Sequence, residues 1–431
     1  MNKLDINDDF KRALDLIEDT SYNIFVTGRA GTGKSTLLKY FRDNTKKNVA
    51  VLAPTGVAAV NIAGQTIHSF FGFRPDITVE KVKSSFKSVR RAKLYQELDT
   101  IIIDEISMVR ADLLDCINEF LSMHGPHKNR AFGGIQMVFI GDLYQLPPVV
   151  TPSEKELFST VYDSPYFFSA QAMRECEFEI VELNTIYRQQ DNAFIEILNA
   201  IRNKSIDDKL LASLNARHTT AQEKEDDDFR IYITTTNAKV DRVNEQSLAT
   251  LNAPQRTYAG RASGNFKQKT TPAPMSLKIS LGAQVMMTNN DQLDRWINGT
   301  VGKVVNISTG KDNQDILHVQ LASGKVVDVS PNTWEMYRFY FDPKRKVVDS
   351  ETVGSYTQYP LTLAWAITIH KSQGKTFERA TIDLDKGTFA HGQAYVALSR
   401  CVSLQGMILK TPIQHHHILV DERIAQYLAR A

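Results

Sequence analysis

Short apolar runs alternate with amphipathic segments along most of the chain. Near the N-terminus, apolar residues recur at helical spacing behind Asp8 and Asp9, which predicts a helix that either residue can cap. Runs with strand character follow at 23–26, 49–53, 100–103, 137–140, 178–183, 230–234 and 380–384. Because buried strands that alternate with helices are typical of parallel sheets, we predict an α/β protein.

The interval from residue 284 to residue 357 has a different pattern. Strand-like runs there are joined by turn signals such as Asn298-Gly299 and Ser323-Gly324. The runs are "AQVMMT", "GTVGKVVNI", "DILHVQL", "KVVDV" and "MYRFYF". We therefore predict a small antiparallel barrel inserted into the second of two α/β domains. The acidic run at 223–228 is predicted to be a solvated loop.

Composition and charge narrow the class of protein. The chain has 431 residues, of which 42% are hydrophobic and 23% charged, as expected for a soluble globular protein of two or more domains. The net charge is only +2, so binding of nucleic acid must depend on local basic patches. The three cysteines fit neither a disulfide framework nor a zinc site, and no apolar run is long enough to span a membrane. The N-terminal segment is typical of an amphipathic helix and not of a signal peptide, which predicts a cytosolic protein.

The strongest single motif is "GRAGTGKS", from Gly28 to Ser35. It follows a predicted strand and opens a predicted helix, which is the context of a phosphate-binding loop. Glycines allow a tight loop whose N–H groups point at phosphate oxygens. Lys34 is predicted to reach the β- and γ-phosphates, and Ser35 to ligate Mg²⁺. The candidate nucleotide contacts in this motif are Gly28, Gly31, Thr32, Gly33, Lys34, Ser35 and Thr36. The alternative is an ordinary glycine turn.

Two further strand ends carry polar residues suited to nucleotide chemistry. "IIIDEIS" places Asp104 for Mg²⁺ and Glu105 to polarise the attacking water, although an Asp-Glu pair at a strand end is often only a helix cap. "MVFIGDLYQLPPV" places Gln145 near the γ-phosphate or the attacking water. A proline-rich linker between domains is the other reading of that second motif.

Taken together, the motifs resemble one helicase family. "GRAGTGKS", "APTGVAA", "TIHSFF", "IIIDEIS", "FGGIQMVFIGDLYQLPPV", "TIYRQ", "ITTTNAKVDRVN", "NGTVGKVV", "TIHKSQGKTFE" and "YVALSR" occur in the order found in the Pif1 family of superfamily 1B DNA helicases. The resemblance spans nearly the whole chain.

This resemblance implies two RecA-like P-loop NTPase domains with parallel sheets, ATP between them, and a small inserted subdomain in each. The implied boundaries are 1–70 and 94–180 for domain 1A, 71–93 for subdomain 1B, 181–283 and 358–431 for domain 2A, and 284–357 for an SH3-like barrel, subdomain 2B. The segment 71–93 is rich in Lys and Arg and is expected beside the duplex junction, although a basic helical face is often only solvated.

The implied activity is ATP- and Mg²⁺-dependent 5′→3′ translocation on single-stranded DNA with unwinding of forked or tailed duplexes. G-quadruplexes and RNA–DNA hybrids are further candidate substrates. A monomer in the bacterial cytoplasm, associated with the nucleoid through DNA and acting in replication, repair, recombination or telomere maintenance, is expected. A translocase that displaces bound proteins without unwinding has the same motor residues and stays open. A nucleotide-switch binding module is disfavoured, because such a module could dispense with several of these catalytic residues. A P-loop kinase is disfavoured because the second domain carries its own phosphate-facing motifs.

The resemblance also assigns residues of the second domain and of the DNA track. Arg188 and Arg400 are implied to be arginine fingers, and Gly374 and Glu378 to approach ATP. Tyr187 is expected either to pack on adenine or to be an ordinary core tyrosine. The implied DNA contacts are Pro54, Thr55, Gly56, His68, Thr235, Asn237, Thr368, His370, Lys371 and Ser372. His68 is alternatively a buried histidine with satisfied hydrogen bonds.

One family feature is missing. Relatives carry a Gln near the first helix that reads the edge of adenine, and "INDDFKRALDLI" has none. Asn7, Asp8 or Asp9 are the possible substitutes. We therefore expect weaker discrimination between ATP and other nucleoside triphosphates. The three consecutive histidines at 415–417 do not have the spacing of a metal site.

Overall fold

The chain folds into two compact units and crosses from one to the other after residues 187, 334, 353 and 420. The first unit comprises residues 1–187, 335–353 and 421–431, and the second comprises residues 188–334 and 354–420. The computed structural model describes residues 6–189, 191–219, 229–264, 266, 271–310, 313–384, 387–388 and 390–429. The acidic run at 223–228 lies outside the described residues. No helix of the described ranges is both long enough and apolar enough to cross a membrane.

The first unit is built on a six-stranded parallel sheet with strand order β3-β2-β4-β5-β1-β6. Its strands are β1 (Asn23–Gly28), β2 (Val49–Ala53), β3 (Gln65–Thr66), β4 (Thr100–Ile103), β5 (Gln136–Ile140) and β6 (Phe178–Leu183). Side chains alternate between the two faces, so Ile24 and Val26 pack in the cluster that includes α1 and α2, whereas Phe25 meets Phe167 edge-on. The α/β prediction is confirmed.

Helices cover this sheet on both faces. They are α1 (Asp8–Asp19), α2 (Lys34–Asn44), α3 (Gly56–Asn61), α4 (Ile67–Phe71), α5 (Val79–Ser85), α6 (Ala92–Gln96), α7 (Ala111–His124), α8 (Pro152–Ser159) and α14 (Glu422–Ala429), with the 3₁₀ helices η1 (Ile106–Met108), η2 (Ala131–Gly134), η3 (Phe167–Ser169) and η4 (Gln171–Arg174). The predicted cap of α1 was wrong. Asn7 is the cap, because its Oδ1 accepts from the N–H of Phe10 at 2.9 Å.

The second unit contains a smaller parallel sheet with strand order β18-β7-β19-β20. Its strands are β7 (Ile231–Thr234), β18 (Ala366–Thr368), β19 (Ala380–Asp383) and β20 (Met407–Leu409). The accompanying helices are α9 (Asn192–Arg202), α10 (Asp208–Asn215), α11 (Asn237–Ala249), α12 (Ile369–Ser372), α13 (Gln393–Leu398) and the 3₁₀ helix η6 (His415–His417).

The same unit holds a β-rich part with its own apolar core. A five-stranded antiparallel sheet runs β14-β13-β12-β11-β17, and β8 and β10 form a separate pair. The strands are β8 (Arg256–Ala259), β10 (Ser276–Ile279), β11 (Gln284–Met287), β12 (Val301–Thr309), β13 (Asp315–Leu321), β14 (Val326–Val329) and β17 (Leu361–Leu363). Leu277 and Ile279 of β10 join the core cluster of this part. The β-rich region therefore includes strands before residue 284.

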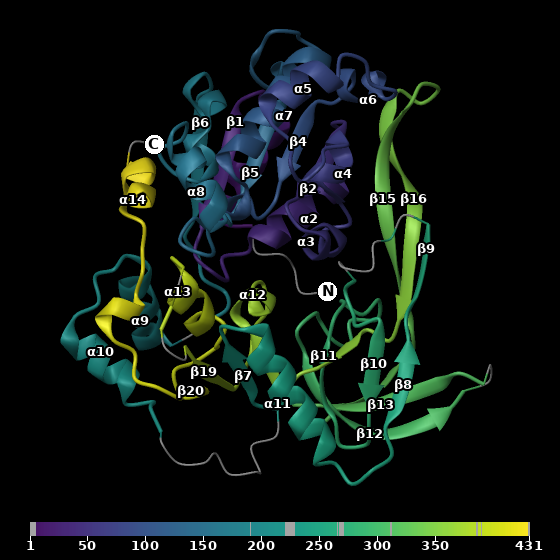
Figure 1. The fold of residues 1–431 in the computed structure, drawn as a ribbon, viewed down its shortest axis with the longest axis vertical. Coiled ribbons are helices and arrows are strands. Elements are labelled where there is room, and N and C mark those ends of the chain that lie inside the picture. The colour runs from purple at the N-terminus through teal and green to yellow at the C-terminus, as the bar shows by residue number, and fades with distance from the viewer. Residues whose placement is uncertain are drawn as a thin grey trace. The chain divides into compact units, whose positions relative to one another are not determined.

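A long hairpin, β15 (Asn332–Asp342) and β16 (Val347–Gln358), extends from the second unit, where β16 pairs with β9 (Arg261–Gly264) (Figure 1). Its middle belongs to the first unit. There the N–H of Phe339 donates to Gln65 Oε1 at 3.3 Å, and its carbonyl accepts from Arg91 Nη1 at 3.1 Å. The domain boundaries given from sequence stay predictions.

Candidate nucleotide and DNA sites

The glycine-rich loop joins β1 to α2, and its backbone requires glycine at specific positions. Gly28, Gly31 and Gly33 have φ of 147°, 85° and 89°. A Cβ on Gly28 would lie 2.6 Å from the carbonyl oxygen of Leu183. Gly33 directly precedes α2 in the left-handed conformation. These glycines leave the loop's N–H groups at a helix N-terminus, which is the arrangement that binds phosphate.

Lys34 is held inside this loop. Its ammonium donates to the carbonyls of Gly28 and Arg29 at 2.7 and 2.9 Å. The buried Thr32 hydroxyl donates to the carbonyl of Arg29 at 3.0 Å and closes the turn. Ser35 and Thr36 are exposed in the first turn of α2. The loop therefore has a cation at its centre and hydroxyls at its rim.

The two predicted carboxylates stand at the carboxyl end of β4. Asp104 accepts from the N–H of Glu105 at 2.9 Å. Burial raises the pKa of Asp104 to about 6, against the opposing effects of this hydrogen bond and the charge of Lys34. Glu105 has a φ of 52°, a left-handed conformation that costs free energy for a residue with a side chain.

The residues present fit a Mg²⁺–nucleotide complex. A desolvated carboxylate regains stability when a cation binds it, and hydroxyl and carboxylate oxygens are the ligands that Mg²⁺ prefers. The hydroxyls of Thr27 and Ser107, next to the glycine loop and to Glu105 in sequence, are buried and lack a hydrogen-bond partner among the described residues. Such groups are rare and require a reason. No three or more His, Cys, Asp or Glu side chains of the described residues are grouped to hold a metal by themselves.

Gln145 is oriented by a residue to which sequence analysis gave no role. Asp142 is buried at the end of β5 and accepts from the N–H of Tyr144 and from Gln145 Nε2, both at 3.2 Å. Gly141 brings this loop against the turn after β4, since a Cβ there would lie 3.0 Å from Ile106 Cγ2. The end of β5 is thus packed against the turn that carries Glu105.

Tyr187 lies beside the phosphate loop. Its side chain is 46% exposed, and its N–H donates to the carbonyl of Gly31 at 2.9 Å. A Cβ on Gly33 would lie 3.9 Å from the ring. Its hydroxyl accepts from Asn7 Nδ2 at 3.3 Å. Tyr187 is therefore not a core tyrosine, and its ring is available to a nucleobase.

The predicted DNA contacts of the first unit gather at one edge of its sheet. Pro54, Thr55 and Gly56 follow β2, and His68 follows the adjacent β3, where Ala53 pairs with Thr66. The hydroxyl of Thr55 caps α3 by accepting from the N–H of Ala58 at 3.3 Å. His68 is half-buried in α4.

The predicted DNA contacts of the second unit gather in the same way. They follow β7 and β18, which pair at Thr234 and Thr368; these contacts are Thr235, Asn237, Thr368, His370, Lys371 and Ser372. Asn237, His370 and Lys371 are exposed. Ser372, by contrast, is fully buried and its hydroxyl donates to the carbonyl of Ile369 at 2.7 Å. Thr368 is buried and caps α12.

The two predicted arginine fingers make contacts within the second unit. Arg400 is 1% exposed, and its guanidinium donates to the carbonyl of Val396 at 2.8 Å and to the Ser399 hydroxyl at 2.8 Å. Arg188 donates to the carbonyl of Ser399 at 3.4 Å. Gly374 and Glu378 are exposed. The roles of Arg188 and Arg400 as arginine fingers stay predictions.

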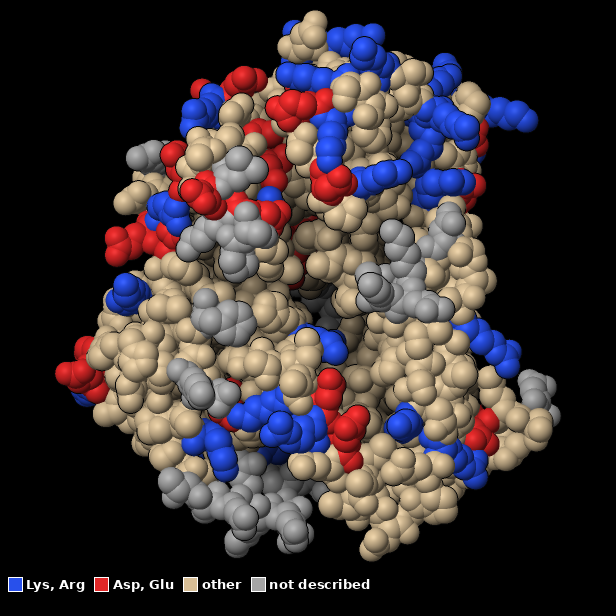
Figure 2. All heavy atoms as spheres, viewed as in Figure 1, with Lys and Arg blue, Asp and Glu red and all other residues tan. Residues whose placement is uncertain are grey.

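Basic residues gather at the α5 and α6 end of the first unit on the face drawn in Figure 2. Several of them have partners within the unit. Lys81 pairs with Asp76 and Lys83 with Glu119, while Lys93 lies over the ring of Phe341.

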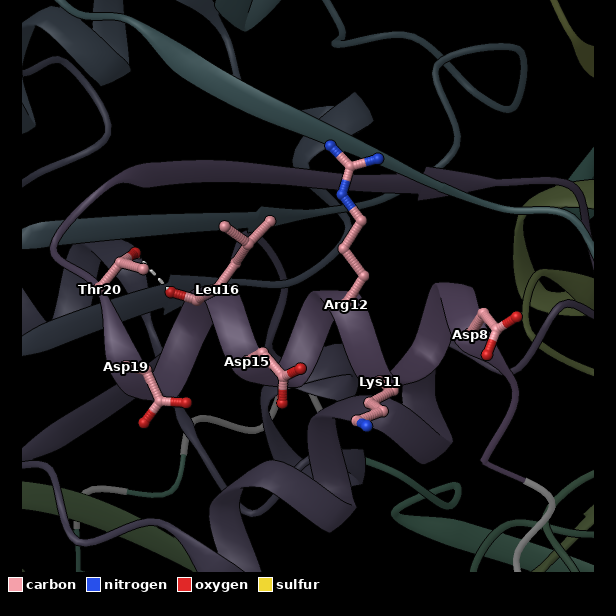
Figure 3. Close-up of a pocket in the computed structure, with 7 residues that line it drawn as sticks. All are labelled: Asp8, Lys11, Arg12, Asp15, Leu16, Asp19 and Thr20. Carbon is pink, nitrogen blue, oxygen red and sulfur yellow. Dashed lines mark hydrogen bonds between the residues drawn. The ribbon is translucent and has the colours of Figure 1, made fainter.

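A shallow pocket of about 460 Å³ lies on the outer face of α1 (Figure 3). It is lined by Asp8, Lys11, Arg12, Asp15, Leu16, Asp19 and Thr20. Asp8 is one of the possible substitutes for the adenine-reading Gln, and the other six residues belong to neither the nucleotide nor the DNA motifs. The pocket therefore adds nothing to the candidate site.

A glycine loop between β1 and α2, with carboxylates at the end of a neighbouring strand, defines a P-loop nucleoside triphosphatase. The chain matches the PIF1-like helicase family over residues 5–210. It is 31% identical to the ATP-dependent DNA helicase Pif1 of Bdellovibrio bacteriovorus, with 99% of this chain and 92% of that protein covered. The crystal structure of Bacteroides sp. Pif1 with ADP-AlF4 superposes with a TM-score of 0.90 at 36% identity, covering 99% of this chain and 97% of that one. Bacteroides Pif1 bound to single-stranded DNA gives a TM-score of 0.69 at 34% identity, with 99% and 97% covered.

The chain belongs to the Pif1 family of helicases and is an ATP-dependent DNA helicase.

Proposed function

We propose that this helicase translocates 5′→3′ on single-stranded DNA and unwinds the duplex ahead of it. The observation that carries the proposal is the grouping of the predicted DNA contacts: each unit collects its own set at the carboxyl ends of adjacent parallel strands. The exposed amide of Asn237, the imidazole of His370 and the ammonium of Lys371 suit contact with the DNA backbone without sequence readout. The direction is the one that the resemblance to the family implies.

The proposed division of labour at the nucleotide follows from the positions of the side chains. Lys34 and the loop N–H groups hold the β- and γ-phosphates, and Ser35 and Asp104 would hold Mg²⁺, which when bound neutralises phosphate charge. Glu105 orients the attacking water with Gln145, which Asp142 fixes in place. Arg188 and Arg400 stabilise the charge of the transferring phosphoryl group.

Tailed and forked duplexes are the proposed substrates, with G-quadruplexes and RNA–DNA hybrids as further candidates. We propose a monomeric enzyme that acts on DNA in the bacterial cytoplasm. Because this class of binding depends on phosphate contacts, affinity for DNA should fall steeply with salt.

Displacement of bound proteins without unwinding is the second candidate. The observation in its favour is that Lys81, Lys83, Arg91 and Lys93 of the predicted junction segment have partners within the first unit. Fewer cations are then available to a duplex junction than the sequence indicates.

Translocation is tested by streptavidin displacement from biotinylated single strands. We expect rapid displacement from the 3′ end and none above background from the 5′ end, with ATP and Mg²⁺. Displacement from the 5′ end alone would overturn the direction. Displacement from the 3′ end without unwinding of any tailed duplex would support the second candidate.

We also propose weak selection of the nucleobase. Asn7 is the substitute nearest Tyr187, but its Oδ1 caps α1 and its Nδ2 donates to Thr185 and Tyr187. Both ends of this amide are therefore engaged. The expected kcat/KM for GTP is within about 10-fold of that for ATP. A preference for ATP of three orders of magnitude would contradict this proposal.

A further inference from the structure

Lys375 lies in the middle of the 368–378 segment and has no role in the proposed DNA or nucleotide contacts. It is partly buried, and its ammonium donates to Asn298 Oδ1 at 2.5 Å. Gly299, with a φ of 98°, lies so close that a Cβ there would be 3.1 Å from Lys375 Cβ. The Asn298-Gly299 turn thus contacts both the stem and the charge of this lysine.

This turn is anchored to the five-stranded sheet of the β-rich part. The N–H of Gly299 donates to the carbonyl of Met287, the last residue of β11, at 2.9 Å. The N–H of Asn298 donates to Asn290 Oδ1 at 2.8 Å. The turn that accepts the Lys375 ammonium is therefore connected to the β-rich sheet by hydrogen bonds.

The main chain of Lys375 is hydrogen-bonded to residues at the ends of α12 and α13, the helices that accompany the parallel sheet. Its N–H donates to the carbonyl of Ser372, the last residue of α12, at 3.0 Å. Its carbonyl accepts from Nη1 of Arg400, which follows α13, at 3.3 Å. One residue therefore connects α12, the end of α13 and the β-rich sheet.

Burial disfavours the charged form of the Lys375 ammonium. It lowers the pKa of Lys375 to about 8. A neutral side chain of the same length would fill the space without that cost.

We propose that Lys375 is a positioning residue for DNA-stimulated ATP hydrolysis. Its ammonium on Asn298 holds the 368–378 segment against the β-rich sheet, so that DNA bound at His370 and Lys371 sets the position of Gly374 and Glu378. This inference rests on the proposed role of that segment in contacting both DNA and nucleotide.

The test measures the stimulation of ATP hydrolysis by saturating single-stranded DNA in the full chain, relative to the rate without DNA. Lys375→Met keeps most of the stem and removes the charge. We expect stimulation to fall by about 10-fold, with the DNA-free rate unchanged. Thermal melting and DNA affinity of the variant verify that it folds.

A pH series separates positioning from simple packing. Between pH 7 and 9.5 the stimulation of the wild-type protein should decline as Lys375 loses its proton, and that of Lys375→Met should not. The other charged groups around this site are His370 and Lys371 on α12, Arg400 after α13, and Arg295, which pairs with Asp291 before the turn. Burial lowers the pKa of His370 further below this range, and both arginines stay charged throughout.

Asn298→Asp is the matched variant. It keeps the contact and adds a counter-charge, so the decline in stimulation should move to higher pH. Unchanged stimulation in Lys375→Met, or the same pH profile in all three proteins, would overturn the role of Lys375. A wild-type protein without any stimulation by DNA would instead contradict the proposed function.

Discussion

At the scale of the residue, Glu105 shows how the site stores strain. Its φ of 52° is a conformation that glycine adopts freely and glutamate does not. The proposed water-orienting carboxylate is thus presented from a backbone that stability alone does not favour.

Replacement of Glu105 by glycine should therefore separate stability from turnover. We predict that Glu105→Gly abolishes ATP hydrolysis while the free energy of unfolding is unchanged or rises by up to about 1 kcal/mol. Urea denaturation and steady-state ATPase assays measure the two effects. Asn129, whose φ is 61°, provides the control, since Asn129→Gly should keep normal hydrolysis. A loss of more than about 1 kcal/mol in Glu105→Gly would contradict this account.

The sequence predicted which residues form the nucleotide site better than it predicted their hydrogen-bond partners and burial. The phosphate loop could be placed because each glycine and Lys34 has a local physical requirement. The hydrogen bond between Asn7 and Tyr187 could not be placed, because it joins residues 180 positions apart. The burial of Ser372 and Arg400 could not be predicted either, because it depends on how the surrounding elements pack, although their hydroxyl and guanidinium donate to nearby carbonyls. The contact of Lys375 with Asn298 could not be predicted because the two residues are 77 positions apart.

At the scale of the element, the apolar run "LTLAWAI" at 361–367 has the pattern of one strand-like stretch and is divided between two sheets. Leu361–Leu363 pairs with β11, whereas Ala366–Thr368 pairs with β7. Leu361 and all three residues of β18 are buried, and the apolar run continues through both strands, so it does not reveal the change of partner. The strands themselves could be predicted, but their pairing could not.

The C-terminal helix α14 packs against residues that lie far from it in the sequence. Tyr427 stacks on Phe168 at 4.5 Å between ring centroids and meets Phe167 edge-on at 6.0 Å. Aromatic pairs of this kind stabilise beyond the area they bury.

Removing this ring should destabilise the first unit. We predict that Tyr427→Ala lowers the free energy of unfolding by about 2–3 kcal/mol. Tyr22, which is 60% exposed, is the matched control, and Tyr22→Ala should change stability by less than about 0.5 kcal/mol. Equal effects of the two substitutions in urea denaturation would show that α14 contributes no packing energy.

At the scale of the whole molecule, Lys375 predicts how stability depends on pH. Its pKa in the folded protein, about 8, is below its ordinary value of 10.5. The burial cost is therefore fully present below pH 8 and disappears as pH rises towards 10.5, where the unfolded chain also loses the proton.

Lys375→Met removes this cost. At pH 7 we expect the variant to be more stable than wild type by about 1–2 kcal/mol, after allowance for solvent screening and the lost hydrogen bond to Asn298. The difference should shrink between pH 8 and 10. The opposite result would be a variant that is less stable than wild type at pH 7 and whose free energy of unfolding rises relative to that of wild type as the pH rises. That result would refute the linkage.

The most direct test of the central claim is unwinding of two matched duplexes, one with a 5′ single-stranded tail and one with a 3′ tail. With ATP and Mg²⁺ we predict strand separation of the 5′-tailed duplex only. Glu105→Gln and Lys34→Ala should bind DNA normally and separate neither substrate. Unwinding from the 3′ tail, or persistent unwinding by either variant, would contradict the assignment of direction or of the P-loop chemistry.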